Sequence, residues 1–146
     1  MYKKKPILRK ENIFLGLSSI TRDEAITKAG NVLVESGYVT ENYIKAMFER
    51  EEIVSTFIGN GVAIPHGVGN ARNAIKNSGL VVLQFPDGID YNGNECHLVI
   101  GISGKDNDHI KILSNIAEQL SDEDKAKKLW KTNDIDFVYD VFVNGE

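Results

Sequence analysis

The chain has 146 residues, of which 42% are hydrophobic and 26% charged, so it fits one globular domain and is too apolar to be disordered. Five of its 17 basic residues lie within the first ten positions, which hold no acidic residue, and the remaining body therefore carries a net charge of −9. An acidic body argues against nucleic acid as the main ligand, and the single cysteine, Cys96, excludes a disulfide framework and a cysteine-rich zinc module.

Two helices are predicted at the start of the body. Thr21 opens a capping-box pattern, apolar residues follow it at helical spacing, and Gly37 is expected to end this helix. Thr40 is expected to cap a second helix that runs to about Arg50 or Glu51. Both helices are amphipathic, which predicts that each packs one face against a core.

Three apolar strands are predicted next. Val62–Ile64 follows a glycine-rich turn and ends at Pro65, which has no amide hydrogen for a sheet ladder. Residues 80–85 form a second strand, with a turn expected at residues 86–88, and residues 98–102 form a third. These strands are continuously apolar instead of alternating, which predicts a sheet covered by helices on both faces.

Three more helices are predicted in the last third of the chain, the first with an inward apolar stripe that begins at Ile110. Their expected caps are Asn107 or Asp108, Ser121, and Thr132 or Asn133. The order of two helices, three strands and three helices predicts an α/β or α+β fold, packed in layers within one domain.

Nucleotide and metal motifs fail on their spacing. Gly59-Asn60-Gly61 begins like a dinucleotide fingerprint, but Ile64 occupies the third glycine position. Residues 101–105 have glycines too close together for a phosphate-binding loop. No two of the three histidines are three or four residues apart, so no helix or turn presents a pair of metal ligands. We therefore expect neither a metal nor a nucleotide cofactor.

His66 is the most informative residue of the sequence. It follows a buried strand and Pro65, and Gly67 after it allows backbone donors and a ligand to come close. Loops at strand ends are where α/β proteins usually place their chemistry. A lone histidine after a proline is often a hydrogen-bonded structural residue, so the local pattern leaves both interpretations open.

Two further residues are suited to holding a phosphate. His109 lies in the first turn of a predicted helix, where free N–H groups and the helix dipole favour anions. Arg50 ends another helix, and a guanidinium pairs bidentately with phosphate. Each is also an ordinary residue for a helix end. Together with a neutral imidazole at His66, they form a chemically coherent site for a phosphorylated histidine.

From about Glu11 to its end, the chain resembles the enzyme IIA component of the mannitol-specific phosphotransferase system, in the mannitol and fructose class. The proline–histidine segment is shared by the wider class, including nitrogen-regulatory relatives, whereas the contexts of Arg50 and His109 point to the mannitol branch. The segments that carry the resemblance are Asn12–Gly16, Phe48–Glu51, Phe57–Gly59, Val62–Gly67 and Asn107–Ile110.

The resemblance implies a role for each candidate. His66 matches the histidine that accepts a phosphoryl group from phospho-HPr and passes it to a cysteine of enzyme IIB, which drives mannitol uptake. His109 and Arg50 match residues that stabilise the phosphate. His97 matches no functional position, so we expect a structural role for it. We expect His66 to be partly exposed in a shallow depression, because both partners have to reach it.

The resemblance also implies an α/β sandwich, with a mixed sheet between helices, over residues 11–146. Residues 1–10 then form a basic extension. We expect a cytoplasmic phosphotransferase that meets the membrane only through the permease, because the chain has neither a signal peptide pattern nor a membrane-length apolar run. The alternative is a regulatory, nitrogen-type protein that binds targets according to its phosphorylation state. A related hexitol in place of mannitol also stays open.

Overall fold

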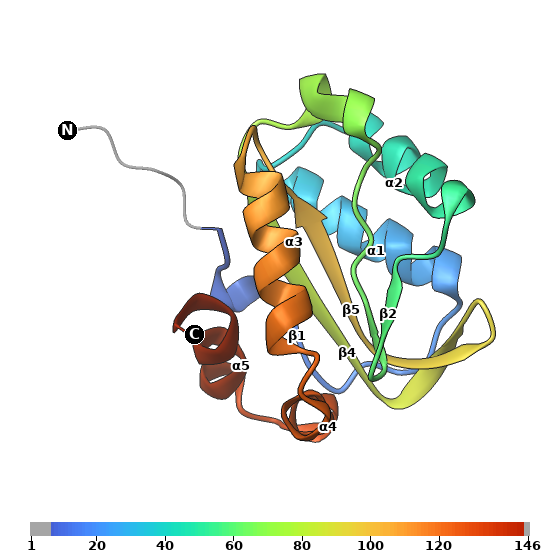
Figure 1. Cartoon of the computed structure of the whole chain (residues 1–146), viewed down its shortest axis with the longest axis vertical. Coiled ribbons are helices and arrows are strands. Elements are labelled where there is room, and N and C mark those ends of the chain that lie inside the picture. The colour runs from blue at the N-terminus through green and yellow to red at the C-terminus, as the bar shows by residue number, and fades with distance from the viewer. Residues whose placement is uncertain (1–6, 145–146) are drawn as a thin grey trace.

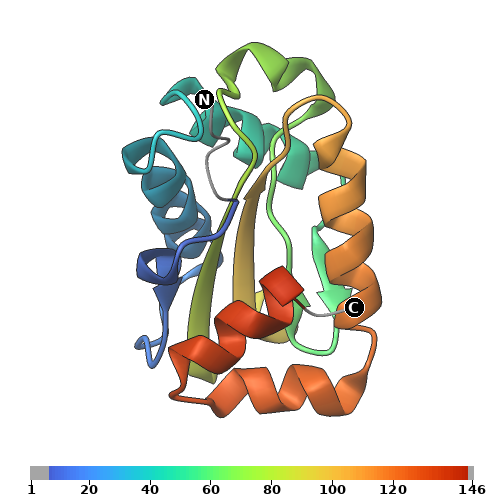
Figure 2. The same cartoon turned by 90° about the vertical axis from the view of Figure 1, so that its left-hand side faces the viewer.

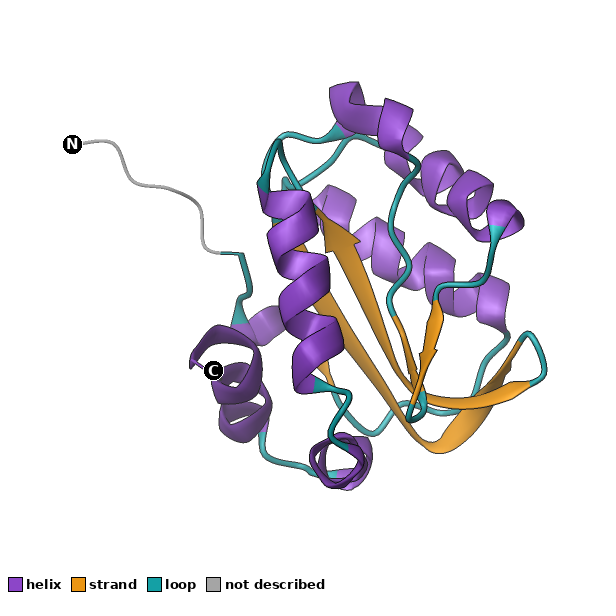
Figure 3. Cartoon of the chain, in the orientation of Figure 1, coloured by secondary structure: helices purple, strands orange, loops and turns teal. Residues whose placement is uncertain are grey.

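A mixed five-stranded sheet runs through the molecule between two layers of helices (Figures 1 and 3). The computed structural model describes residues 7–144. The sheet has the order β1-β4-β5-β3-β2, in which β4 and β5 pair antiparallel, β1 and β3 are parallel to their neighbours β4 and β5, and β2 is antiparallel to β3. The strands are β1 Ile13–Phe14, β2 Phe57–Gly59, β3 Val62–Ala63, β4 Gly79–Tyr91 and β5 Asn94–Ser103.

Helices cover both faces of the sheet, as the sequence predicts (Figure 2). Val81 and Leu83 of β4 belong to the core under α1 and α2, whereas Leu80 and Val82 belong to the core under α3, α4 and α5. Neighbouring strand residues are thus buried on opposite faces, which explains the continuous apolar runs. The helices are α1 Arg22–Glu35, α2 Asn42–Ile53, α3 Asp108–Gln119, α4 Glu123–Lys131 and α5 Ile135–Asn144, with 3-10 turns η1 Lys10–Asn12 and η2 Gly69–Ala74.

The start signals of the first two helices differ in outcome. The Thr21 hydroxyl accepts the Glu24 amide at 3.1 Å, and the Glu24 carboxylate accepts the Thr21 amide at 3.0 Å, so the predicted capping box of α1 is present. Gly37 takes a φ of 83° just after α1, as expected of a helix stop. The prediction of Thr40 as the cap of α2 is wrong, since Glu41 is the N-cap and no side chain caps the helix.

The caps of the last two helices are also displaced from their predicted positions. Asp122 caps α4 and Asp134 accepts amides of the first turn of α5, in place of the predicted Ser121 and Thr132 or Asn133. Each of these carboxylates accepts two backbone amides, one more than the single amide expected of a capping hydroxyl. Asn107 is the N-cap of α3 as predicted, but Ile110 is 70% exposed and does not belong to the inward stripe.

The predicted turn at residues 86–88 is wrong, because β4 continues through it to Tyr91. Pairing with β5 shifts register within this stretch, where Pro86 has no amide to offer, so the ladder is interrupted by a bulge. The chain reverses instead at Asn92 and Gly93, which both have positive φ, at 55° and 87°. Two such residues favour the tight turn of a β-hairpin.

The first described residues pack against the sheet. Leu8 is buried, the Ile7 carbonyl accepts the Leu80 amide at 2.9 Å, and Lys10 pairs with Asp136 at 2.9 Å. The boundary predicted after residue 10 is therefore not marked by a break in packing, and residues 1–6, with most of the basic cluster, lie outside the described residues. Within residues 7–144, no helix is long and apolar enough to cross a membrane.

Candidate functional site

His66 lies where the chain leaves the sheet after β3. The Ile102 amide donates to the Pro65 carbonyl at 3.0 Å, and His66 bridges to Ile102 of β5, so the segment stays attached beyond the strand. Tyr43 of α2 donates its hydroxyl to the Ile102 carbonyl at 2.7 Å and accepts the Gly67 amide at 2.8 Å. A Cβ at Gly67 would lie 2.6 Å from the Tyr43 ring, which explains the glycine.

A single hydrogen bond orients the His66 ring. Nδ1 lies 2.7 Å from the Ile64 carbonyl oxygen, which can only accept, so Nδ1 carries the proton and Nε2 holds a lone pair. Within residues 7–144, Nε2 makes no hydrogen bond. A fully buried side-chain nitrogen or oxygen without a partner occurs there only at Asn12, so Nε2 is not fully buried. The unprotonated nitrogen is therefore the one that reaches the molecular surface.

The expectation of a partly exposed His66 is wrong. The residue is only 6% exposed, because it packs between the Tyr43–Gly67 contact, the Ile64 carbonyl and the ring of His109. Accessibility is thus confined to one edge of the imidazole. A reacting group has to approach along that edge, so the site selects direction as well as chemistry.

His109 meets His66 from the start of α3. The two ring centroids are 5.3 Å apart and the rings are tilted by 62°. Gly104 allows the preceding loop to pass against this turn, since a Cβ there would lie 2.3 Å from the His109 Cα. The side chain of the N-cap residue Asn107 accepts no amide of the first turn, and the negative charge near this helix end comes from Asp108 of that turn.

Arg50 lies in the last turn of α2, and its Nη1 donates to the Val54 carbonyl at 2.7 Å. Burial is the main cause that lowers the pKa of His66 below its ordinary value of 6.5, and the charges of Arg50 and His109 lower it further. Burial and then Arg50 also lower the pKa of His109. Both imidazoles are therefore neutral near pH 7. The structure thus brings together the three residues that the sequence singled out.

Two supporting residues were missed by sequence reasoning. The helical apolar spacing of Tyr43 predicts only a place on the core face of α2, whereas its hydroxyl joins Ile102 and Gly67, and burial raises the pKa of this hydroxyl to about 12 and keeps it a neutral donor. Gly104 carries no motif, and its contact with His109 depends on tertiary packing. The predicted fold places Tyr43 and Gly104 in the region of His66 and His109. It does not predict which atoms of these residues touch.

A hollow of about 380 Å³ lies beside the histidines, lined by Tyr43, Gly67, Arg72 and His109 among others. Arg72 adds a second guanidinium on this side. Within residues 7–144, no group of three histidine, cysteine or carboxylate side chains is placed to hold a metal ion. Cys96 is buried, which raises the pKa of its thiol to about 12, so it is not poised as a thiolate.

Large apolar side chains are exposed on two sides of the site. Ile53 and Val54 follow Arg50 at the end of α2 and are 73% and 58% exposed, and Ile110 next to His109 is 70% exposed. We call these three residues the apolar rim. Exposed apolar groups around a reactive polar centre are typical of a protein-docking surface.

The chain is similar to a known protein family and to named relatives. The family model described as "Phosphoenolpyruvate-dependent sugar phosphotransferase system, EIIA 2" matches residues 6–145. The mannitol-specific phosphotransferase enzyme IIA component of Staphylococcus aureus (strain Mu50) is 43% identical over 136 residues, which cover 93% of this chain and 94% of that protein.

Two solved structures from Escherichia coli are also similar. The crystal structure of IIA mannitol has a TM-score of 0.84 at 36% identity and covers 92% of this chain and 98% of that chain. The complex of IIA mannitol with phosphorylated IIB mannitol contains a chain with a TM-score of 0.86 at 34% identity. The match covers 94% of this chain and 99% of that chain. The likeness therefore extends over the whole fold that positions the two histidines.

Proposed function

The chain belongs to the enzyme IIA type 2 family of the phosphoenolpyruvate-dependent sugar phosphotransferase system, and from this premise we propose that Nε2 of His66 carries the phosphoryl group. The observation that supports this role is the Nδ1 bond to the Ile64 carbonyl, which leaves the accessible nitrogen unprotonated. The depressed pKa of His66 keeps this nitrogen available at neutral pH. The protein is then a phosphotransferase that relays the group between other proteins.

The transfer is balanced in bonds and electrons. The Nε2 lone pair forms a bond to phosphorus while the bond between phosphorus and the donor histidine nitrogen breaks, and its electron pair stays on the donor. The His66 ring becomes cationic, and Nδ1 keeps its proton and donates it to the Ile64 carbonyl. In the second step an acceptor cysteine thiolate attacks phosphorus, and the electron pair returns to Nε2. The ring therefore ends each cycle in its starting protonation state.

Groups that can stabilise a phosphate lie near the transferred group. Arg50, as a cation, and His109, as a neutral imidazole, are the two residues we assign to phosphate stabilisation. Arg72 and Asp106 line the neighbouring hollow that His109 also lines. The start of α3 adds a positive partial charge, which the carboxylate of Asp108 in its first turn partly offsets. Because phosphoryl transfer requires little covalent work from the protein, these fixed charges and the orientation of His66 account for its catalysis.

The donor is phospho-HPr and the acceptor is an enzyme IIB cysteine. The likeness to a IIA chain complexed with phosphorylated IIB supports the acceptor, and the apolar rim supplies a surface on which both partners dock in turn. Mannitol is the transported polyol, since a relative of nearly equal length is named mannitol-specific. The regulatory alternative shares the His66 chemistry but lacks transfer to IIB, so the same likeness favours the carrier.

Labelling with phospho-HPr tests the proposal. We expect an acid-labile phosphate on the wild-type protein, none on His66→Ala, and slowed onward transfer to IIB for His109→Ala. Labelling that survives His66→Ala would refute the role of His66. Labelling without transfer to any IIB of a hexitol permease would instead support the regulatory function.

A further inference from the structure

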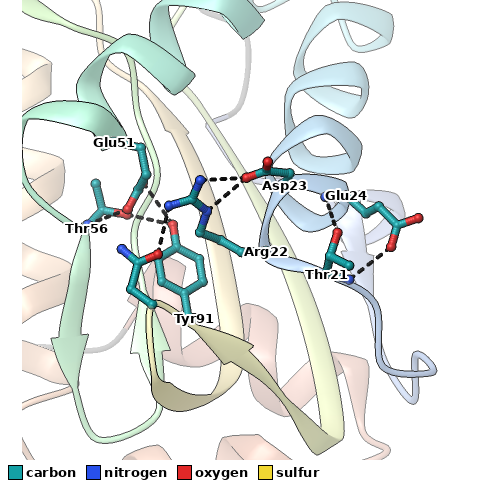
Figure 4. Close-up of polar contacts among 8 residues, drawn as sticks. Thr21, Arg22, Asp23, Glu24, Glu51, Thr56 and Tyr91 are labelled. Carbon is teal, nitrogen blue, oxygen red and sulfur yellow. Dashed lines mark hydrogen bonds and ion pairs between the residues drawn. The ribbon is translucent and has the colours of Figure 1, made fainter.

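The residue that follows Arg50 in α2 carries a buried carboxylate. Glu51, the next residue of α2, is only 4% exposed. Its Oε2 accepts the Thr56 amide at 2.8 Å, and its Oε1 accepts the Thr56 hydroxyl at 2.8 Å and the Tyr91 hydroxyl at 2.9 Å (Figure 4). Burial raises the pKa of Tyr91, which keeps its hydroxyl a proton donor. Three donors satisfy a group that only accepts, so the cluster holds a stable buried charge.

The cluster is connected to His66 through backbone hydrogen bonds. The Thr56 carbonyl accepts the Ile64 amide at 3.0 Å, and the Ile64 carbonyl accepts Nδ1 of His66 at 2.7 Å. Glu51 therefore fixes Thr56, Thr56 fixes Ile64, and Ile64 orients the imidazole. A displacement of the segment before β2 would move the one acceptor that sets the His66 tautomer.

The same segment anchors Arg50. Its guanidinium donates to the Val54 carbonyl, two residues before Thr56. Glu51 thus holds the stretch on which both the guanidinium and the orientation of His66 depend. The charge of Glu51 also affects His66. Burial, Arg50 and His109 lower the pKa of His66, whereas the Glu51 carboxylate raises it and so favours the cationic ring. The other groups that sense the Glu51 charge are Arg22, Tyr91 and Cys96.

We propose that Glu51 is a positioning residue for phosphoryl transfer, which keeps Arg50 and the Ile64 carbonyl in place and adds a buried negative charge near the imidazole. The inference rests on the proposed role of His66. The ring is cationic while it carries the phosphoryl group, and the buried anion favours that state without touching the phosphate. Arg50 stabilises the phosphoryl oxygens, so the two neighbours in sequence act on opposite charges.

Glu51→Gln tests the charge with little change in shape. The amide oxygen still accepts the Thr56 amide, and the amide nitrogen donates to the two hydroxyl oxygens, which can rotate to accept. The matched control is Glu52→Gln, which removes the same charge from the exposed neighbouring residue. For Glu51→Gln we expect the maximal transfer rate from phospho-HPr to fall about tenfold at an unchanged half-saturating donor concentration. We also expect the NMR titration midpoint of His66 to move to lower pH.

The inference is overturned if Glu51→Gln and Glu52→Gln share the same transfer rate and the same His66 midpoint. Should Glu51→Gln fail to fold, Tyr91→Phe decides, with Tyr139→Phe of α5 as its control. Tyr91→Phe removes one donor from the carboxylate and is expected to slow transfer about threefold, and equal rates for the two phenylalanine variants would overturn the inference. Phosphate retained by His66→Ala would contradict the proposed function itself, which keeps the two failures distinct.

Discussion

Two histidines of this protein are buried to the same degree, yet their surroundings differ in kind. His66 is 6% and His97 is 5% exposed. His97 uses both ring nitrogens, since Nδ1 contacts the Phe85 carbonyl at 3.1 Å and Nε2 contacts the Glu95 carboxylate at 2.7 Å. Its ring also stacks on Trp130 with centroids 4.1 Å apart. His66 uses only Nδ1.

The difference shows that burial alone does not separate a structural histidine from the one we propose to be reactive. What separates them is the number of ring nitrogens that the fold has already engaged. His97 joins β4, β5 and α4 and has no nitrogen left for a ligand, whereas His66 keeps a lone pair at the surface. Four predictions, from the largest effect to the smallest, test this contrast.

The contrast predicts opposite outcomes for the same substitution at the two histidines. His66→Ala is expected to abolish phosphate labelling with a smaller loss of stability than His97→Ala, because the His66 ring makes one hydrogen bond and no stacked aromatic contact. His97→Ala is expected to retain labelling per folded molecule but to lose about 3 kcal/mol of unfolding free energy, because it empties a packed aromatic site. Labelling with phospho-HPr and urea denaturation measure the two effects. Loss of labelling in folded His97→Ala would remove the contrast.

Gly104→Ala is predicted to have the next largest effect, because it displaces His109, whose ring lies against the ring of His66. The new Cβ would lie 2.3 Å from the His109 backbone, so the loop or the start of α3 has to shift. We expect transfer to fall about tenfold to a hundredfold, measured by single-turnover labelling. Gly69→Ala is the control, since nothing lies within 4 Å of its added Cβ. Equal transfer by both variants would show that the His109 position is not critical.

Ile110→Asp is predicted to weaken docking while the chemistry at His66 is retained. The apolar rim lies next to Arg50 and His109 in the sequence, and a charge placed in it opposes burial by a partner protein. The half-saturating concentration of phospho-HPr is expected to rise about tenfold at a nearly unchanged maximal rate. Ile135→Asp on α5 places the same charge on another helix and should have no effect. A fall in maximal rate alone would place Ile110 outside the docking surface.

The smallest effect concerns pH. Because the folded-state pKa of His66 lies below the unfolded value of 6.5, the unfolded chain binds more protons in acid, and stability falls as pH drops from 6.5 toward the folded pKa. The slope from this group is at most about 1.4 kcal/mol per pH unit. Urea unfolding between pH 7 and 5 should therefore be less pH-dependent for His66→Asn than for the wild-type protein. An unchanged slope would mean that His66 is not desolvated in the fold.

The sequence predicted the elements that follow from local chemistry or from one buried face. The capping box at Thr21 and the apolar run of residues 80–85 both reappear, because each depends on near neighbours or on burial alone. The turn expected at Pro86 did not form, since pairing with β5 absorbs the proline as a bulge. The two-residue strand β1 escaped prediction because only its partner β4 defines it.

The site was predictable as a set of residues but not as an arrangement. His66, His109 and Arg50 were singled out from motif and position, and they do come together. The burial of His66 and the role of Tyr43 were not foreseen, because both depend on contacts between segments far apart in the chain. The burial of Glu51 was not foreseen although it ends one of the segments that carry the resemblance, since a glutamate in a helix is ordinarily solvated.

The acceptor that holds the Nδ1 proton is a main-chain oxygen, and this has a consequence for how the protein tolerates mutation. A replacement of the Ile64 side chain leaves its carbonyl oxygen in place, unless the new residue bends the backbone. The reactive tautomer is therefore protected from most single substitutions and is exposed only to changes that reroute the chain, such as the loss of Pro65 or Gly67. Substitutions in the docking surface can therefore change the affinity for a partner without changing which nitrogen of His66 is unprotonated.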